Sequence, residues 1–173
     1  MKNIAINTLK YTGVVTISQY IGGKKITLAK VHNEGGPALF EFLANCLVGD
    51  FTLAKATRPV KATILAKDAN GNYVQHNYGV GFVGILTEPE KVYDNSTGTF
   101  NGVKYSFLIP KEIVENIGDI NNAYLGLYTN GATMENLDYF AARCKLKLSK
   151  TNTISAALLV DWQLMITNGS KSE

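Results

Sequence analysis

The chain has 173 residues, of which 46% are hydrophobic and 18% charged, and its formal net charge is +3. This length suits one domain with its own core, and the charged fraction lies below the roughly 25% usual for soluble domains. No run reaches the ~18 apolar residues that cross a bilayer, and the N-terminal residues lack a signal peptide's apolar region, so we expect synthesis in the cytoplasm and no membrane partner.

The first predicted element is a β-hairpin at residues 12–31. Apolar and polar side chains mix in two runs rich in β-branched residues, and Gly22 and Gly23 separate the runs. A glycine pair supplies the positive φ angles that a tight hairpin turn needs. We therefore expect two adjacent antiparallel strands near the N-terminus.

A helix is predicted next. Pro37 suits the first helical position, Glu41 lies in the first turn, and Gly49 is a C-terminal stop. Between these positions, apolar residues recur at helical spacing, at Leu39, Phe40, Leu43, Cys46 and Leu47. This is the one well-defined helix, and its apolar stripe is expected to cover an edge or an open end of a sheet.

The pattern is β-rich for nearly the rest of the chain. Asn70 and Gly71 are typical of a tight turn between two strands, and Pro110 opens a short helical turn at residues 111–117. Residues 81–86 are expected to pair with residues 103–109. Strands are predicted at residues 60–67, 73–78, 81–86, 103–109, 123–128, 143–148 and 156–167.

The last of these strands has the clearest alternation. One face carries five large apolar side chains, so we predict that Trp162 anchors the core, and the opposite face is half-buried or meets a partner. The five are Leu158, Val160, Trp162, Leu164 and Ile166. Together the elements predict a mainly β protein, an antiparallel β-sandwich of Greek-key or jelly-roll type with one inserted α-helix. We expect residues 1–173 to form a single domain, with residues 168–173 frayed.

Residues 79–84 match the dinucleotide-binding pattern G-x-G-x-x-G. That motif requires a helix to begin at the glycines, because the helix N-terminus receives the pyrophosphate. Pro89 and an extended run follow here, which favours glycines that relieve a crowded or bent strand. No cofactor is therefore expected.

Catalytic and metal sites are not predicted either. His32 and His76 stand in unrelated places, outside any nucleophile or zinc pattern. Glu88 and Glu90, with Asp94 nearby, favour a solvated loop over a calcium site or a glycosidase pair, because those sites need defined spacing or facing carboxylates. Cys46 and Cys144 have no Cys or His at ligand spacing, so both are expected to be buried free thiols.

The charge is unevenly distributed along the chain. Residues 1–67 carry nine Lys and Arg against three Asp and Glu, whereas residues 68–173 carry eight against eleven. Apart from Lys24 and Lys25 in the expected turn, the basic residues are spread singly, which disfavours nucleic acid as a partner. We expect residues 1–10 to form a docking arm that acts with the basic hairpin turn. The interface candidates are Ile4, Ile6, Leu9, Lys10, Lys24 and Lys25.

Two segments resemble small β-sandwich structural proteins of tailed bacteriophage virions. They are residues 33–49, closing on Arg58 and Pro59, and the terminal strand at residues 155–168. The resemblance implies a virion component without a catalytic site, either capsid-associated, as decoration or head fibre, or in the neck or tail. Its partners would be further copies of itself and other virion proteins, such as the major capsid or neck and tail proteins. A carbohydrate-binding or receptor-binding module is the alternative, and a hydrolase whose carboxylates meet only in the fold is a third.

Overall fold

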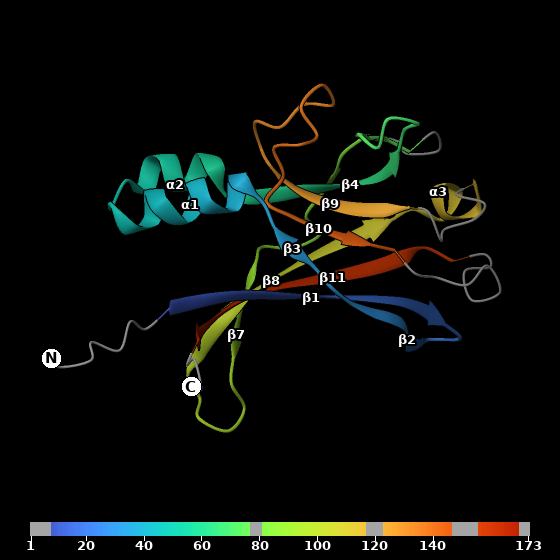
Figure 1. Cartoon of the computed structure of the whole chain (residues 1–173). Coiled ribbons are helices and arrows are strands. Elements are labelled where there is room, and N and C mark those ends of the chain that lie inside the picture. Colours follow the sequence, from blue (N-terminus) through green and yellow to red (C-terminus); the bar gives the residue numbers. More distant parts are fainter. Residues whose placement is uncertain (1–7, 77–80, 117–122, 147–155, 170–173) are drawn as a thin grey trace, which may run out of the picture.

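The computed structural model describes residues 8–76, 81–116, 123–146 and 156–169, which contain eleven strands and three helices (Figure 1). In chain order these are β1 (Thr8–Ile21), β2 (Lys24–His32), β3 (Glu34–Gly35), α1 (Pro37–Leu47), α2 (Phe51–Thr57), β4 (Pro59–Lys67), β5 (Tyr73–Gln75), β6 (Val83–Gly84), β7 (Glu90–Tyr93), β8 (Phe100–Ile109), α3 (Lys111–Asn116), β9 (Tyr124–Thr129), β10 (Ala142–Lys145) and β11 (Leu158–Gly169).

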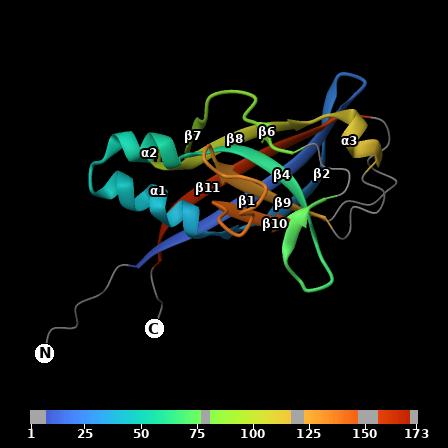
Figure 2. The same cartoon turned by 90° about the horizontal axis from the view of Figure 1, so that it is seen from above.

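The strands form two antiparallel sheets that lie face to face (Figures 1 and 2). One has the order β2-β1-β11-β8-β7, and the other has the order β3-β10-β9-β4-β5, with β6 also paired to β4. The chain crosses from one sheet to the other after β2, β6, β8 and β10. The predicted antiparallel β-sandwich is therefore confirmed.

Turn residues explain the two predicted hairpins, and both are confirmed. Gly22 and Gly23 have φ angles of 58° and 77° between β1 and β2. Between β4 and β5, Gly71 has a φ of 86°, and the Asp68 carboxylate accepts hydrogen bonds from the backbone N–H groups of Asn70 and Asn72. A side chain that satisfies the turn's own N–H groups fixes the turn locally.

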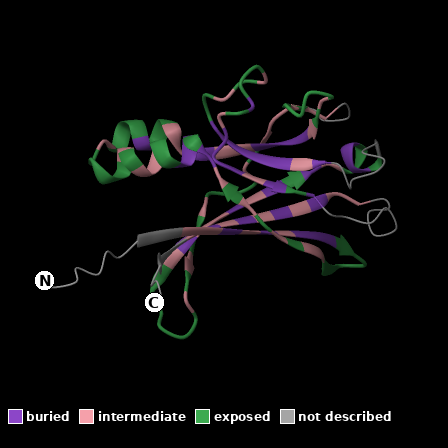
Figure 3. Ribbon diagram, in the orientation of Figure 1, coloured by how far each residue is buried: buried purple, intermediate pink, exposed green. Residues whose placement is uncertain are grey.

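The core lies between the sheets, and the interior faces of both are buried (Figure 3). Trp162 is fully buried, and its register neighbours are Val15 on β1 and Tyr105 on β8. The predicted position of Trp162 in the core is thus confirmed. The largest fully buried side chains are Trp162, Tyr128, Phe107, Ile17, Leu65, Leu125, Leu127, Leu146 and Leu158.

The predicted partner of residues 81–86 is wrong for the strand within them. β6 pairs with β4, and β8 has β7 and β11 as its partners, although the Leu86 N–H just after β6 donates to the Ser106 carbonyl oxygen of β8 at 2.7 Å. The partners of β8 include β11, which is far away in sequence and which a local pattern cannot identify. At the C-terminal end, β11 includes Asn168 and Gly169, which pair with Leu9 and Thr8 of β1, so the strand enters the segment that was expected to fray. Residues 170–173 lie outside the described residues.

Helix α1 begins as predicted, but a second helix, α2, follows it and was not predicted. The Asp50 carboxylate accepts a hydrogen bond from the backbone N–H of Leu53 and caps the N-terminus of α2. Together α1 and α2 form a helical hairpin that extends from one end of the sandwich (Figure 1). Only Ala38, Leu39 and Ala54 are buried within these two helices.

The direction of the helical hairpin depends on a close backbone approach at Gly36. The Gly36 N–H donates to the Ala141 carbonyl oxygen at 2.9 Å, and a Cβ at this position would overlap the Phe140 carbonyl oxygen. Glycine therefore lets the chain pass against the segment that leads into β10 just before Pro37 begins α1. The short helix predicted after Pro110 is present as α3. Among the described residues, none of the helices has the length and hydrophobicity needed to traverse a bilayer.

Candidate functional site

The end of the helical hairpin exposes three large apolar side chains. Leu47, Val48 and Phe51 are 84%, 77% and 75% exposed, and we call these three residues the hairpin tip. Gly49, with a φ of 76°, turns the chain between them. The nearby Asp50 carboxylate is engaged as the cap of α2. The tip is therefore a convex surface of apolar groups that the fold itself leaves uncovered.

More apolar surface lies along the same two helices. Phe40 is 59% and Leu53 50% exposed, and the charged residues of α1 and α2 are Glu41 and Lys55. Burial colouring shows most of the helical hairpin as exposed (Figure 3). Several large apolar side chains are therefore exposed on two adjacent helices, and exposed apolar surface of this kind is typical of binding surfaces.

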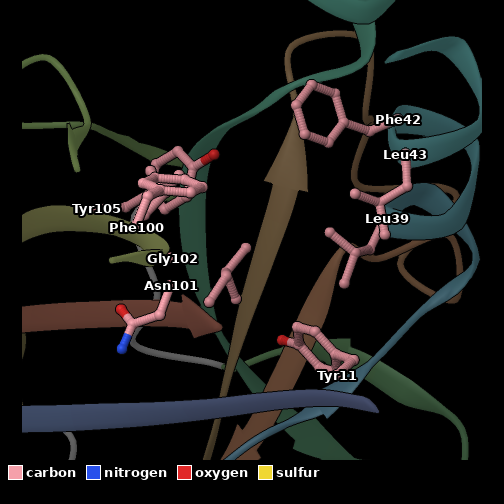
Figure 4. Close-up of a pocket in the computed structure, with 10 residues that line it drawn as sticks. Tyr11, Leu39, Phe42, Leu43, Phe100, Asn101, Gly102 and Tyr105 are labelled. Carbon is pink, nitrogen blue, oxygen red and sulfur yellow. The ribbon is translucent and has the colours of Figure 1, made fainter. Parts of the chain in front are cut away.

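A hollow of about 300 Å³ lies at the base of the helical hairpin (Figure 4). Side chains from α1 form one wall, residues of β8 form the opposite wall, and β1 and β11 contribute one residue each. No lining residue is charged. The lining consists of Tyr11, Leu39, Phe42, Leu43, Phe100, Asn101, Gly102, Val103, Tyr105 and Leu164.

The hollow holds few polar atoms, and one of them lacks a partner. The Oδ1 atom of Asn101 is buried and accepts no hydrogen bond within the described part of the chain. The Tyr11 hydroxyl accepts a hydrogen bond from Asn33 Nδ2 at 2.9 Å. Burial raises the pKa of Tyr11, and it raises the pKa of Tyr105 to about 12, so both hydroxyls stay neutral at physiological pH. The hollow therefore suits an apolar group accompanied by one hydrogen-bond donor.

The structure separates the predicted interface residues from one another. Leu9 and Lys10 belong to β1, where they pair with Asn168 and Thr167 of β11, so they are not part of a free arm. Ile4 and Ile6 lie outside the described residues.

The basic pair in the turn, Lys24 and Lys25, lies at the other end of the 14-residue strand β1. Lys24 is exposed, whereas Lys25 forms an ion pair with Asp161 at 2.8 Å. At about 3.3 Å per residue, β1 places this turn on the order of 40 Å from Thr8. Residues 1–7 of the expected docking arm lie outside the described residues, so a docking role for the arm and the basic turn stays a prediction.

The glycine motif and the acidic residues, for which the sequence predicted no catalytic or binding role, lie in ordinary structural positions. The motif's last glycine, Gly84, lies in the short strand β6, and no helix occurs at residues 81–93, whereas Gly79 and Val80 lie outside the described residues. The two glutamates considered for a calcium or glycosidase site have basic partners: Glu88 lies 3.6 Å from Arg58, and Glu90 lies 2.6 Å from Lys104. Across residues 8–76, 81–116, 123–146 and 156–169, no group of three His, Cys, Asp or Glu side chains could hold a metal ion.

The two histidines sit in different surroundings. His32 ends β2 and is exposed, whereas His76 follows β5 and is half-buried. Burial lowers the pKa of His76, which favours its neutral form.

The two cysteines differ, and one prediction about them is wrong. Both are free, as expected, but Cys46 is exposed on α1 and only Cys144 is buried. The helical stripe that contains Cys46 was expected to lie on a sheet, whereas α1 extends beyond the sandwich near its C-terminal end. Burial raises the pKa of Cys144 to about 12 and makes it unreactive.

A second hollow, lined by residues that include His32, Glu34, Tyr73, Tyr124 and Arg143, is more polar. Its aromatic rings already have partners. The Arg143 guanidinium lies 3.6 Å from the Tyr73 ring centroid and is ion-paired with Glu34, and Tyr73 meets Tyr124 edge to face. The site therefore offers less free aromatic surface than its composition suggests.

Comparisons with family models, with curated proteins and with solved structures give no match. The two apolar surfaces, the hairpin tip and the hollow, are accordingly the features that bear on the function. Sequence reasoning missed the hairpin tip, although one signal was present: Val48 and Phe51 continue an apolar pattern across Gly49, where a helix end on a protein surface is normally polar.

Proposed function

We propose that the chain is a non-enzymatic structural protein of a tailed bacteriophage virion that works by protein–protein assembly. Its place would be on the capsid, as decoration or head fibre, or in the neck or tail, and its partners would be further copies of itself and other virion proteins. The observation that carries the assembly role is the hairpin tip, with Leu47, Val48 and Phe51 each at least 75% exposed. The virion setting is supported by the resemblance of residues 33–49 and 155–168.

The exposed hairpin tip has an energetic cost in the isolated monomer. Covering a large apolar side chain contributes roughly 1.5–3 kcal/mol, and an isolated monomer forgoes this at every residue of the tip. Apolar tips of this kind also promote nonspecific association, so a soluble protein retains one where a partner covers it. An assembly protein has such a partner in its working state.

The alternatives have weaker support. A carbohydrate-binding module stacks free aromatic faces on sugar rings, but Arg143 lies over the Tyr73 ring. A hydrolase needs facing carboxylates, whereas Glu88 and Glu90 have Arg58 and Lys104 as neighbours. The assembly role is therefore the one that the described surfaces favour.

The test combines two measurements on the full chain. Sedimentation velocity over a wide concentration range should show self-association, and mass spectrometry of purified phage particles should find the protein in them. Glycan-array binding by the same preparation provides the comparison with the alternative. A protein that stays monomeric at every concentration and is absent from particles would contradict the proposal.

A further inference from the structure

We infer that the hairpin tip of one copy binds in the hollow of a second copy of the same chain. This rests on the proposed function, because it specifies how the copies of an assembly protein contact each other. The two surfaces are a convex set of apolar side chains and a concave apolar site, and one chain carries both. Contacts between unlike surfaces of identical chains can close into rings or reciprocal pairs.

A chain cannot fill its own hollow with its own tip. Leu39, Phe42 and Leu43, which form a wall of the hollow, lie on the same helix α1 that ends in Leu47. That helix has 11 residues, a rigid rod about 16 Å long, so its end cannot fold back onto its side. The hairpin tip of a chain is therefore excluded from the hollow of that same chain, and a second copy can place its own tip there.

The sizes of the two surfaces agree. A volume of about 300 Å³ is at the lower end of the range for sites that enclose a small organic ligand, about 300–1,000 Å³. Such a site takes one or two large side chains and not a whole helix. Phe51 with Leu47 or Val48 at a narrow turn fits this requirement.

The chemistry of the surfaces agrees as well. The tip and the lining of the hollow contain no charged side chain, so their contact removes no ion from water. The buried Oδ1 of Asn101 lacks a donor, and the exposed Thr52, next to Phe51, carries a hydroxyl that can supply one. A buried acceptor without a partner destabilises the chain that contains it, so a donor from a second copy favours the complex.

The available apolar area sets the size of the contact. Phe40, Leu47, Val48, Phe51 and Leu53 are 50–84% exposed. At roughly 150–250 Å² for an aromatic side chain and less for an aliphatic one, they present on the order of 500 Å². This is less than the ~800 Å² per partner of a standard interface, so the contact has the size of a weak or transient one, whose strength depends on concentration.

The other obvious contact between copies is less favourable. The edge strand β2 could pair with the β2 strand of another copy, but it carries Lys24 and Lys30, which are both exposed. Lysines along an edge strand oppose such pairing, because two copies would bring like charges together. The tip and the hollow have no such repulsion.

The experiment uses two exposed positions, so that the variants fold. Phe51→Glu alters the tip, and Phe100→Glu alters the hollow, where Phe100 is 52% exposed. Ile21→Glu is the matched control, because Ile21 is 50% exposed at the turn between β1 and β2. We expect each of the first two variants to weaken self-association by at least roughly tenfold in sedimentation experiments, and the control to associate as the original chain does.

Mixing the variants identifies the contact. Phe51→Glu keeps an intact hollow and Phe100→Glu keeps an intact tip, so an equimolar mixture should form a heterodimer although each variant alone is monomeric. A double variant carrying both changes should not pair with itself. Alkylation of Cys46, which is exposed next to the tip, should slow at concentrations where the original chain assembles.

The outcomes distinguish this inference from the proposed function. Three results would overturn the contact and leave the assembly role in place: self-association that survives Phe51→Glu, self-association that is lost in Ile21→Glu, or two variants that do not pair when mixed. If each variant loses self-association and the mixture does not restore it, the result would indicate that the tips of two copies pair with each other. A chain that binds phage particles but does not self-associate would also overturn the contact between copies and leave the assembly role in place. A monomer that is also absent from particles would contradict the proposed function.

Discussion

The Nζ atom of Lys25 lies 2.8 Å from Oδ2 of Asp161, so an ion pair connects β2 to β11 across the intervening strand β1. The other carboxylate oxygen of Asp161 accepts a hydrogen bond from the Ser106 hydroxyl on β8 at 2.7 Å. One carboxylate therefore bridges strands on both sides of β11. The charge of Lys25 is engaged within the fold, which removes it from the set of residues available for steering a partner.

This bridge predicts a pH dependence of stability. Burial raises the pKa of Asp161, but hydrogen bonds from Lys25 and Ser106 and attraction to Lys25 and Lys104 outweigh it and hold the pKa below the ordinary value of 3.8. A lowered pKa in the folded state means that the contribution is complete above pH 3.8 and is lost as the pH falls through the folded value.

We expect Asp161→Asn to lower the free energy of unfolding by about 1 kcal/mol at pH 7, because Lys25 is partly exposed and the pair is screened by solvent. The difference from the original chain should shrink progressively as the pH falls below 3.8. Urea denaturation at several pH values measures it, with Asp138→Asn, at an exposed position, as the control. A difference that does not shrink as the pH falls below 3.8 would show that the carboxylate's charge is not responsible.

Trp162 gives a prediction about packing. It is fully buried, and its indole Nε1 has no hydrogen-bond partner among the described residues. Trp162→Ala should cost about 3–5 kcal/mol because it leaves a large cavity. Trp162→Phe should cost much less, since it keeps a ring and removes the unpaired N–H group. Thermal and chemical denaturation check both, and equal losses in the two variants would contradict this account.

A glycine in β8 is predicted to be intolerant of a side chain. A Cβ at Gly102 would overlap the Leu164 carbonyl oxygen of β11, whereas a Cβ at Gly84 in β6 would have no neighbour within 4 Å. Gly102→Ala should therefore cost about 1–3 kcal/mol as the strands are forced apart. Gly84→Ala, the matched strand control, should leave the denaturation midpoint unchanged or slightly raised. Equal effects would mean that β8 and β11 separate without cost.

The thiols should react at different rates. Cys46 is exposed, whereas Cys144 is buried with a pKa raised to about 12. A disulfide reagent should label one thiol per chain under native conditions and two after denaturation, because the thiolate is the reactive form. Cys46→Ser should abolish the native labelling, whereas Cys144→Ser should leave it unchanged. Labelling that Cys46→Ser does not remove would contradict the burial of Cys144.

Local patterns predict the strands and turns of this protein better than their pairing. Alternation placed Trp162 in the core, and Gly22 with Gly23 defined the first hairpin, because both signals are contained in a few neighbouring residues. The pairing of β6 with β4 and the position of β11 between β1 and β8 depend on contacts between distant segments. No local periodicity encodes such contacts, which explains the wrong partner assigned to residues 81–86.

The candidate site was harder to predict for a related reason. The hollow combines α1 with β1, β8 and β11, and so requires the tertiary arrangement of four elements. The exposure of Leu47 and Phe51 follows from where the helical hairpin leaves the sandwich, which depends on Gly36 passing close to Phe140. An apolar residue in a helix is ordinarily a core residue, and the sequence pattern does not reveal when the helix extends past the core.

The N-terminal residues supply the last prediction, because the structure divides the expected docking arm in two. Thr8, Leu9 and Lys10 pair with residues 167–169 of β11, whereas residues 1–7 precede the described part of β1. Deleting residues 1–7 leaves these three pairs in place. Deleting residues 1–10 also removes the three register pairs, or about three backbone hydrogen bonds, and at about 0.5–1.5 kcal/mol per bond it should lower the free energy of unfolding by about 1.5–4.5 kcal/mol relative to the shorter deletion.

Both truncated chains keep the hairpin tip and the hollow. If self-association depends on those two surfaces, sedimentation of the chain lacking residues 1–7 should match that of the full chain. A marked loss of association on removing residues 1–7 alone, without loss of stability, would instead assign the contact to an arm that includes Ile4 and Ile6. The two truncations thus separate the docking arm expected from the sequence from the surface that the fold exposes, because only the longer deletion removes the pairs of β1 with residues 167–169 and neither deletion removes the tip or the hollow.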